Sequence, residues 1–259
     1  MFPAFFIPLL IVFSPPGPKV EAVNFESRFG PFTGAFILRE VGGGEVARYG
    51  GEACKKRLAP CSTFKIVNAL IGLESGVLKD ENTLFKWDGK PKYIKAWERD
   101  HTLASAIKES CLWYFQEVAR RVGPERMKAF IDKIGYGNED ISGGIDLFWL
   151  DRSLQVSAEE QVTFLEKLYT GRLPFSETNV TLVKRLLVHS SGDCWTLSGK
   201  TGSALTEGKG SLGWYVGHLR SDGREYVFAL NIEAKDGASG AIARQMVIEI
   251  LKDAGMMPR

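Results

Sequence analysis

The chain has 259 residues, of which 44% are hydrophobic and 25% charged, so it can bury a full core as one large domain or two interleaved lobes. Its 33 Lys and Arg nearly balance 31 Asp and Glu, and the formal net charge at pH 7 is +2. Because no long basic run or basic-aromatic interleaving is present, the sequence argues against a nucleic-acid partner. The 3 histidines lack metal-ligand spacing, so we expect no metal site.

The N-terminus resembles an export signal. Residues 1–13 form an apolar run that is too short to span a membrane, and Val20-Glu21-Ala22 offers small residues where a signal peptidase cuts. No Lys or Arg precedes the run, and two prolines interrupt it, so a buried or membrane-associated segment is the alternative. We expect residues 1–22 to be a signal peptide, residues 23–259 to form the folded domain, and the protein to be exported to the periplasm or secreted, without a stable membrane span.

The four cysteines, at positions 54, 61, 111 and 194, show no paired C-x-x-C spacing and have no nearby histidines. In an exported protein, Cys54 and Cys61 could close a short loop through a disulfide. The alternative is that all four are small buried hydrophobic residues.

The first half of the sequence predicts a hairpin followed by helices. Residues 34–39 and 46–49 flank a glycine-rich turn and are typical of paired strands. A buried helix is predicted from Pro60 to about Val77, with Gly76 near its C-cap. Further helices are expected at 102–108, 113–122, 124–134 and 158–169.

The last third returns to strand patterns. Strands are predicted at 195–201, 212–219 and 226–232, with residues 221–224 as a hairpin turn. A final amphipathic helix is predicted at about 241–254. Strands at both ends and helices between them indicate an α+β protein whose N- and C-terminal segments share one antiparallel sheet beside a helical lobe.

The most informative motif is Ser62-Thr63-Phe64-Lys65. If a helix starts here, the hydroxyl and the amine lie on one face, and Ser62 falls in the first turn, where unpaired N–H groups favour developing negative charge. A lysine one turn away can take the serine proton only when burial keeps its amine neutral or when it is otherwise modified. Because Ser-x-x-Lys is also common on solvated helix faces, this motif predicts catalysis only when other catalytic motifs accompany it.

Three further motifs follow in the order used by penicillin-recognising serine enzymes: Ser110-Cys111-Leu112, Tyr136-Gly137-Asn138 and Lys200-Thr201-Gly202. With Phe148-Trp149-Leu150 and Gly213-Trp214-Tyr215-Val216-Gly217, the chain resembles the class D, oxacillinase-type serine β-lactamases from about Gly34 to its C-terminus. The resemblance implies a serine β-lactamase or penicillin-binding transpeptidase-like fold for the domain. It also implies hydrolysis of penicillin-type β-lactams through a serine ester, which confers antibiotic resistance.

The resemblance assigns the nucleophile and the base. Ser62 would attack the lactam carbonyl, and Lys65 would react with carbon dioxide to become the N-carboxylated general base, so no diffusible cofactor is expected. Trp149 would donate to that carbamate, although a tryptophan here would otherwise be read as core. The backbone N–H groups of Ser62 and Ser203 would hold the oxyanion, with Gly202 allowing the substrate to approach the strand edge.

The remaining assignments concern the leaving nitrogen and the substrate carboxylate. Ser110 would pass a proton toward the lactam nitrogen. Lys200, Thr201 and Arg244 would bind the carboxylate, to which a planar guanidinium is suited. Leu112 departs from the commoner family valine and would border the carbamate, where it would retune water entry or carbamate stability.

Two other functions remain open. The sensor domain of penicillin-receptor signalling proteins shares the fold and motifs but keeps its acyl-ester. A cell-wall peptidase acting on D-Ala-D-Ala shares the two serine motifs and Lys-Thr-Gly but does not need the Phe148-Trp149-Leu150 environment. The sequence does not fix the oligomeric state.

Overall fold

The computed structural model describes residues 17–150, 153–206 and 210–258. The apolar run at residues 1–13 lies outside the described residues, and the first described element is the short 3-10 helix η1, Val20–Ala22. No helix within these ranges is long and apolar enough to cross a membrane.

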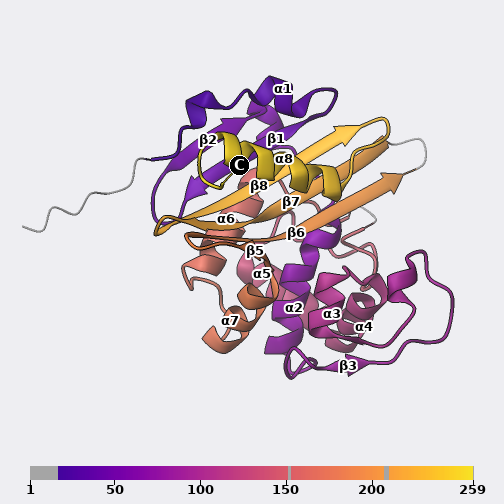
Figure 1. Cartoon of the computed structure of the whole chain (residues 1–259). Helices are drawn as coiled ribbons and strands as arrows, with labels where there is room; N and C mark the ends of the chain where they lie inside the picture. Colours follow the sequence, from indigo (N-terminus) through magenta and orange to yellow (C-terminus); the bar gives the residue numbers. More distant parts are fainter. Residues whose placement is uncertain (1–16, 151–152, 207–209, 259) are drawn as a thin grey trace, which may run out of the picture.

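A six-stranded antiparallel sheet in the order β2-β1-β8-β7-β6-β5 forms the upper half of the molecule (Figure 1). Its strands are β1 (Thr33–Glu40), β2 (Glu45–Tyr49), β5 (Val188–Ser191), β6 (Trp195–Thr206), β7 (Gly210–Ser221) and β8 (Arg224–Ala234). A separate two-stranded sheet pairs β3 (Leu84–Phe85) with β4 (His101–Thr102). Because N-terminal β1 pairs with C-terminal β8, the expected shared sheet is confirmed.

Helices occupy the rest of the fold, most of them in a lobe on one side of the sheet (Figure 1). The α-helices are α1 (Phe25–Phe29), α2 (Lys65–Glu74), α3 (Leu103–Lys108), α4 (Leu112–Val122), α5 (Pro124–Ile134), α6 (Ala158–Tyr169), α7 (Glu177–Leu186) and α8 (Gly240–Asp253). The other 3-10 helices are η2 (Gly51–Cys54), η3 (Cys61–Phe64) and η4 (Lys95–Trp97).

The predicted helices and strands of both sequence halves are present, although the helix predicted from Pro60 to about Val77 is divided into η3 and α2 and ends at Glu74. The sequence patterns missed α1, α7, β5 and the short strands β3 and β4. Strong end signals explain the helices that were found: Pro124 opens α5, and Ser157 forms a capping box with Glu160 at α6. Helix α7 begins at the Ser176 cap but carries Thr and Val in its interior, where β-branching weakens helix propensity.

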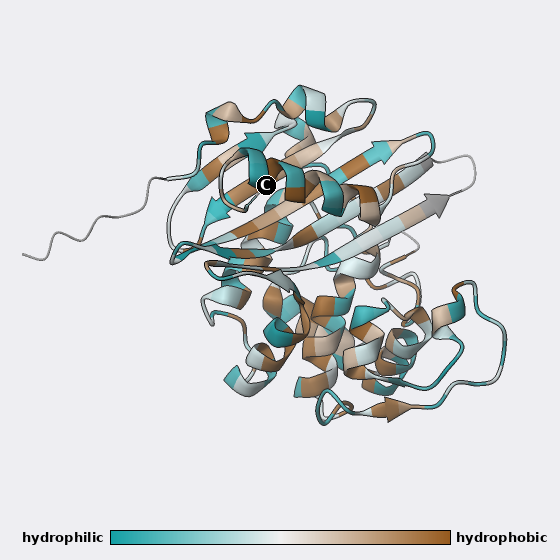
Figure 2. Ribbon diagram, in the orientation of Figure 1, coloured by the Kyte–Doolittle hydropathy of each residue, from teal (hydrophilic) through white to brown (hydrophobic). Residues whose placement is uncertain are grey.

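Two hydrophobic cores lie on opposite faces of the sheet. One is shared by the sheet and α8, and the other extends from the sheet into the helical lobe. Helix α2 runs through the core of the helical lobe and is buried from Lys65 to Leu73, and most of its residues are apolar (Figure 2). The side chains of Lys65 and Asn68 are its polar exceptions, and Asn68 Nδ2 donates to Phe115 O at 3.0 Å.

Candidate functional site

Ser62 lies in η3, the tight turn that leads directly into α2. The sequence placed it in the first turn of an α-helix; the turn is 3-10, and the α-helix itself begins at Lys65. The turn is anchored at both ends, because Cys61 N donates to Trp149 O at 3.0 Å and Thr63 Oγ1 donates to Pro60 O at 2.7 Å. Cys61 adopts a φ of 51°, a left-handed conformation that is costly for a non-glycine residue.

Lys65 points back at the serine, with Nζ 2.6 Å from Ser62 Oγ. Its side chain is 1% exposed, and Nζ lies 5.8 Å from the centre of the Phe115 ring. Burial lowers the pKa of the Lys65 amine from 10.5 to about 8, while the Cys111 and Cys61 thiols oppose the shift. The pocket therefore supplies the desolvated amine next to a hydroxyl that the sequence motif predicts.

Trp149 is fully buried in an aromatic cluster. Its ring stacks on Phe64 with centroids 5.5 Å apart and meets Phe148 edge-on at 4.9 Å. Its indole Nε1 has no hydrogen-bond partner among the described residues. Because a buried donor without an acceptor costs about 1–3 kcal/mol, this N–H fits a site that receives an anionic acceptor.

Ser110 and Lys200 form a second serine–lysine pair. Lys200 Nζ donates to Ser110 Oγ at 2.9 Å and to Thr201 O at 3.1 Å. Ser110 sits between α3 and α4 with a φ of 52°, again in the left-handed region. Burial, and then the charge of Lys65, hold the pKa of Lys200 well below its usual value.

The edge of β6 is open beside this second pair. Strand β5 pairs with β6 only from Thr196 to Ser198, so the β6 edge from Lys200 onward has no strand neighbour on that side. A Cβ at Gly202 would lie 3.0 Å from Pro60 O and 3.2 Å from Thr63 Cγ2. The absence of a side chain at this glycine therefore allows β6 to lie close to the serine-bearing turn.

Ser203 is exposed at the end of this edge, and its Oγ accepts from Gly240 N at 2.8 Å. Its hydroxyl thus ties β6 to the start of α8. Its exposed backbone can face a bound molecule.

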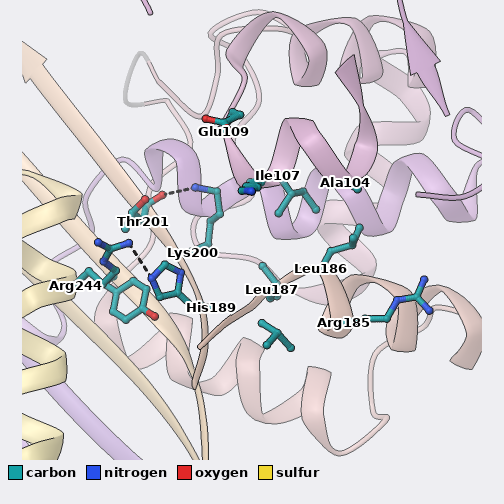
Figure 3. Close-up of a pocket in the computed structure, with 14 residues that line it drawn as sticks. Ala104, Ile107, Glu109, Arg185, Leu186, Leu187, His189, Lys200, Thr201 and Arg244 are labelled. Carbon is teal, nitrogen blue, oxygen red and sulfur yellow. Dashed lines mark hydrogen bonds between the residues drawn. The ribbon is translucent and has the colours of Figure 1, made fainter. Parts of the chain in front are cut away.

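Arg244, on α8, lines a pocket of about 620 Å³ together with Lys200 and Thr201 (Figure 3). Its Nη1 contacts His189 Nε2 at 2.9 Å. His189, at the N-terminal end of β5, was missed by the sequence analysis, since β5 itself was not predicted. Three of the predicted carboxylate-binding residues thus share one cavity.

Leu112 and the Tyr136-Gly137-Asn138 segment contact the core and neighbouring segments of the fold. Leu112 opens α4 and packs, partly buried, against the core of the helical lobe. The Tyr136-Gly137-Asn138 segment is a turn in which Tyr136 OH donates to Gln161 Oε1 at 3.2 Å and Asn138 Nδ2 donates to Ser153 O at 2.7 Å. Both contacts support a site-shaping role.

All four cysteines are in the described ranges and are thiols. Cys54 Sγ donates to Tyr49 O at 3.2 Å and Cys61 Sγ to Ala59 O at 3.5 Å, so the disulfide considered between them does not form here. The alternative, four buried cysteines, is correct at Cys54, Cys61 and Cys111 and wrong at Cys194, which is exposed.

Comparison with known proteins agrees with this geometry. Residues 29–252 match the family model described as the penicillin binding protein transpeptidase domain. The protein named "Probable beta-lactamase YbxI" of Bacillus subtilis (strain 168) is 43% identical over 239 residues, covering 92% of this chain and 87% of that protein.

Solved structures give the same result. A crystal structure of a class D β-lactamase from Bacillus subtilis has a TM-score of 0.86 at 43% identity, covering 93% of this chain and 99% of the other. The C-terminal domain of the Bacillus licheniformis BlaR penicillin-receptor has a TM-score of 0.87 at 32% identity, covering 91% and 96%. Fold and site together define a penicillin-interacting serine protein. Within that class, this chain belongs to the class D serine β-lactamases.

Proposed function

We propose that the protein hydrolyses the amide bond of penicillin-type β-lactams through an ester on Ser62, with N-carboxylated Lys65 as the general base, and so confers antibiotic resistance. The observation that carries the proposal is the buried Lys65 amine, 2.6 Å from Ser62 Oγ, in a pocket where Trp149 Nε1 has no hydrogen-bond partner among the described residues. Membership in the class D family supports it.

Carboxylation of Lys65 fits these surroundings. Only an uncharged amine adds carbon dioxide, and burial lowers the pKa of Lys65 to about 8, so a sizeable uncharged fraction exists near neutral pH. A carbamate supplies a base that accepts a proton without a buried positive charge. Trp149 Nε1 would donate to its oxygens, and carbon dioxide is the one small molecule required.

In the first half-reaction, Ser62 Oγ attacks the lactam carbonyl as its proton passes to the base on Lys65. The backbone N–H groups of Ser62 and Ser203 stabilise the oxyanion. Ser110 then gives its proton to the lactam nitrogen as the C–N bond breaks and takes the proton held by the base on Lys65, which leaves that base free for the second half-reaction. The 2.9 Å contact with Lys200 Nζ holds the Ser110 hydroxyl in place for that transfer.

Substrate binding uses the pocket beside β6. Thr201 and Lys200 present a hydroxyl and an amine to the β-lactam carboxylate, and Arg244 presents a guanidinium from α8. Gly202 keeps β6 close to the serine-bearing turn, which brings this carboxylate site and the nucleophile to one molecule of substrate.

In the second half-reaction, water attacks the ester as the base on Lys65 takes its proton, and Ser62 is released. Leu112, at the start of α4, is apolar and packs against the same core as Trp149. We expect it to limit the number of waters near the base and to exclude those that would hydrate and destabilise the carbamate.

Replacing Lys65 with alanine tests this mechanism. Lys65→Ala should form the penicillin ester slowly and then retain it, which intact-protein mass spectrometry detects as a persistent adduct. Ser62→Ala is the control and should form no adduct. Carbon-13 NMR of the wild type in labelled bicarbonate should show a carbamate resonance that Lys65→Ala lacks; its absence in an active preparation contradicts the assigned base.

A second candidate function is a sensor that binds β-lactams and keeps the ester. The likeness to the BlaR penicillin-receptor domain favours it, and so does the Trp113-Tyr114-Phe115 sequence after the Ser110 motif. The apolar Leu112 favours turnover. Time-resolved mass spectrometry separates the two, since an ester that persists for hours supports the sensor and one that disappears within seconds supports the enzyme.

We also propose that residues 1–22 direct export to the periplasm or the exterior, leaving residues 23–259 as the mature domain. The support is the apolar run at residues 1–13 followed by Val20-Glu21-Ala22. N-terminal sequencing of the protein recovered outside the cytoplasm tests the cleavage position.

A further inference from the structure

The guanidinium of Arg244 contacts an imidazole. Its Nη1 lies 2.9 Å from His189 Nε2, and Figure 3 shows the two side chains pointing toward each other in the pocket that Lys200 and Thr201 also line. Arg244 takes part in none of the ion pairs found among the described residues. Its charge is therefore not neutralised by a described carboxylate and is available to an anionic ligand.

A β-bulge brings His189 to this contact. In the pairing of β5 with β6, Val188 lies opposite Ser198 and Ser190 lies opposite Leu197, so His189 is the extra residue between them. A bulge changes the direction of the side chain it carries and is a feature that folds use beside active sites. This irregularity is the reason that an exposed edge strand delivers an imidazole to α8.

The contact fixes the protonation state of His189. A guanidinium carries only donors, so Nε2 must accept, and the imidazole is then neutral with its proton on Nδ1. Partial burial and the charge of Arg244 both lower the pKa of His189 below its usual 6.5. The other titratable groups that line the pocket are Lys108, Glu109, Arg185, Lys200 and Tyr215. Because cations predominate among them, they also favour the neutral imidazole.

We propose that His189 is a positioning residue for substrate-carboxylate recognition: its neutral imidazole orients Arg244 toward the pocket, and its protonation releases that arginine. The proposal rests on the function proposed above, because it assumes that Arg244 binds the carboxylate of a β-lactam. A protonated imidazole has two donors and no acceptor, so it repels the guanidinium. Carboxylate recognition should weaken as the pH falls through the pKa of His189.

The kinetic test compares a penicillin with its methyl ester, which has the same lactam but no negative charge. The ratio of kcat/KM for the acid to that for the ester isolates carboxylate recognition, since pH effects on the Lys65 base act on both substrates. His189→Ala should lower this ratio by about three- to tenfold at pH 7.5, the effect of losing one positioning hydrogen bond. His189→Gln retains an acceptor and should keep the ratio near wild type.

The pH profile separates positioning from simple packing. In the wild type the acid-to-ester ratio should fall as the pH drops below 6.5, whereas in His189→Gln it should stay flat because glutamine does not titrate. Arg185→Gln is the matched control: it removes a cation lining the same pocket, where Arg185 pairs with Glu81 at 2.5 Å, and it should retain the wild-type profile shape. The proposal is overturned if His189→Ala leaves the acid-to-ester ratio unchanged. It is also overturned if the ratio falls at low pH in His189→Gln as it does in the wild type.

A second measurement does not depend on turnover. Proton NMR should follow the imidazole of His189, assigned with His189→Gln, and should give a pKa below 6.5 in the wild type. In Arg244→Gln that pKa should rise, because the neighbouring positive charge is gone. An unchanged pKa shows that the two side chains do not interact in solution and refutes the positioning role even if β-lactams are hydrolysed. A normal NMR result without hydrolysis refutes only the proposed function.

Discussion

The two serine–lysine pairs of the site are built in different ways. Ser62 and Lys65 are three residues apart and meet through local turn and helix geometry. Ser110 and Lys200 are 90 residues apart and meet only because the turn between α3 and α4 lies against β6. Lys65 has one hydroxyl as its partner in an aromatic pocket, whereas Lys200 has two oxygen partners and reaches the carboxylate-binding pocket.

This difference favours different charge states for the amines of Lys65 and Lys200. The charge of Lys65 is one reason that the pKa of Lys200 is lowered, so the two amines are poorly stabilised as ammonium groups together. Converting Lys65 to an anionic carbamate reverses that interaction and favours a charged Lys200. The proposed carboxylation of Lys65 would therefore also make Lys200 a better ligand for a carboxylate.

The largest expected effect comes from Lys65→Met, which keeps the volume and removes the amine. We expect kcat/KM for a penicillin to fall by about 10³-fold or more, in the range for loss of a general base. Lys200→Met is the matched control; it should also lose activity but retain the carbamate carbon-13 signal. A Lys65→Met enzyme that keeps its turnover would reverse the roles of the two pairs.

The same variant should unfold less readily. The folded-state pKa of Lys65, about 8, is below the unfolded value of 10.5, so the cost of burying the ammonium is fully present below pH 8 and disappears as the pH rises toward 10.5. Removing the amine in Lys65→Met should raise the free energy of unfolding at pH 7 by up to about 3 kcal/mol. Denaturant titrations at pH 7 and pH 10 measure this gain, which should shrink at the higher pH.

Trp149→Phe should reduce kcat by about ten- to a hundredfold by removing the donor to the carbamate. Added bicarbonate should restore much of the loss. Trp214→Phe is the control, because Trp214 is also buried but its Nε1 donates to Ala59 O at 3.1 Å. That variant should lose stability without any bicarbonate response, and equal responses in both would contradict a specific role for Trp149.

The bicarbonate requirement should depend on pH with a change of slope near the pKa of Lys65, about 8. Below pH 8, forming the carbamate from ammonium and bicarbonate releases one proton. The half-activating bicarbonate concentration should therefore rise about tenfold for each unit by which the pH falls. Above it, the curve should be flat. Activity titrations in carbonate-free buffers measure this curve, and a straight line through pH 8 would place the titration on another group.

The smallest effect is expected for Leu112→Val, which restores the commoner side chain of the family. The substitution removes one methylene from a partly buried position, so we expect changes of about two- to fivefold in the bicarbonate requirement. Val122→Ala, at the far end of the same helix, is a control for general loosening of α4. Identical bicarbonate curves for wild type and Leu112→Val would show that Leu112 does not affect the carbamate on Lys65.

Sequence reasoning reached the features that local rules determine. The Ser62–Lys65 contact follows from helical spacing, and the helices that start at Pro124 and Ser157 follow from their capping residues. The Lys200–Ser110 contact came from family resemblance, because no local rule links residues so far apart.

What the sequence did not yield depends on tertiary packing. Strand β5 is short, and its residues Val188–Ser191 carry no alternation that marks a strand, so neither its bulge nor the placement of His189 beside Arg244 could be found. The contact of Gly202 with the Pro60–Thr63 segment was also missed, because these residues are distant in the chain. The left-handed backbone at Ser110 has no signature in the residue type.

The pairing of β1 with β8 bears on when this protein can fold. Thr33 lies opposite Glu233, 200 residues later in the chain, so the centre of the sheet cannot close until nearly the whole polypeptide has left the ribosome. The β1–β2 hairpin lacks its sheet neighbour β8 until the end of synthesis. A chain with this topology cannot complete its central sheet until translation is almost finished. Such a delay is compatible with passage of an unfolded chain through a secretion channel.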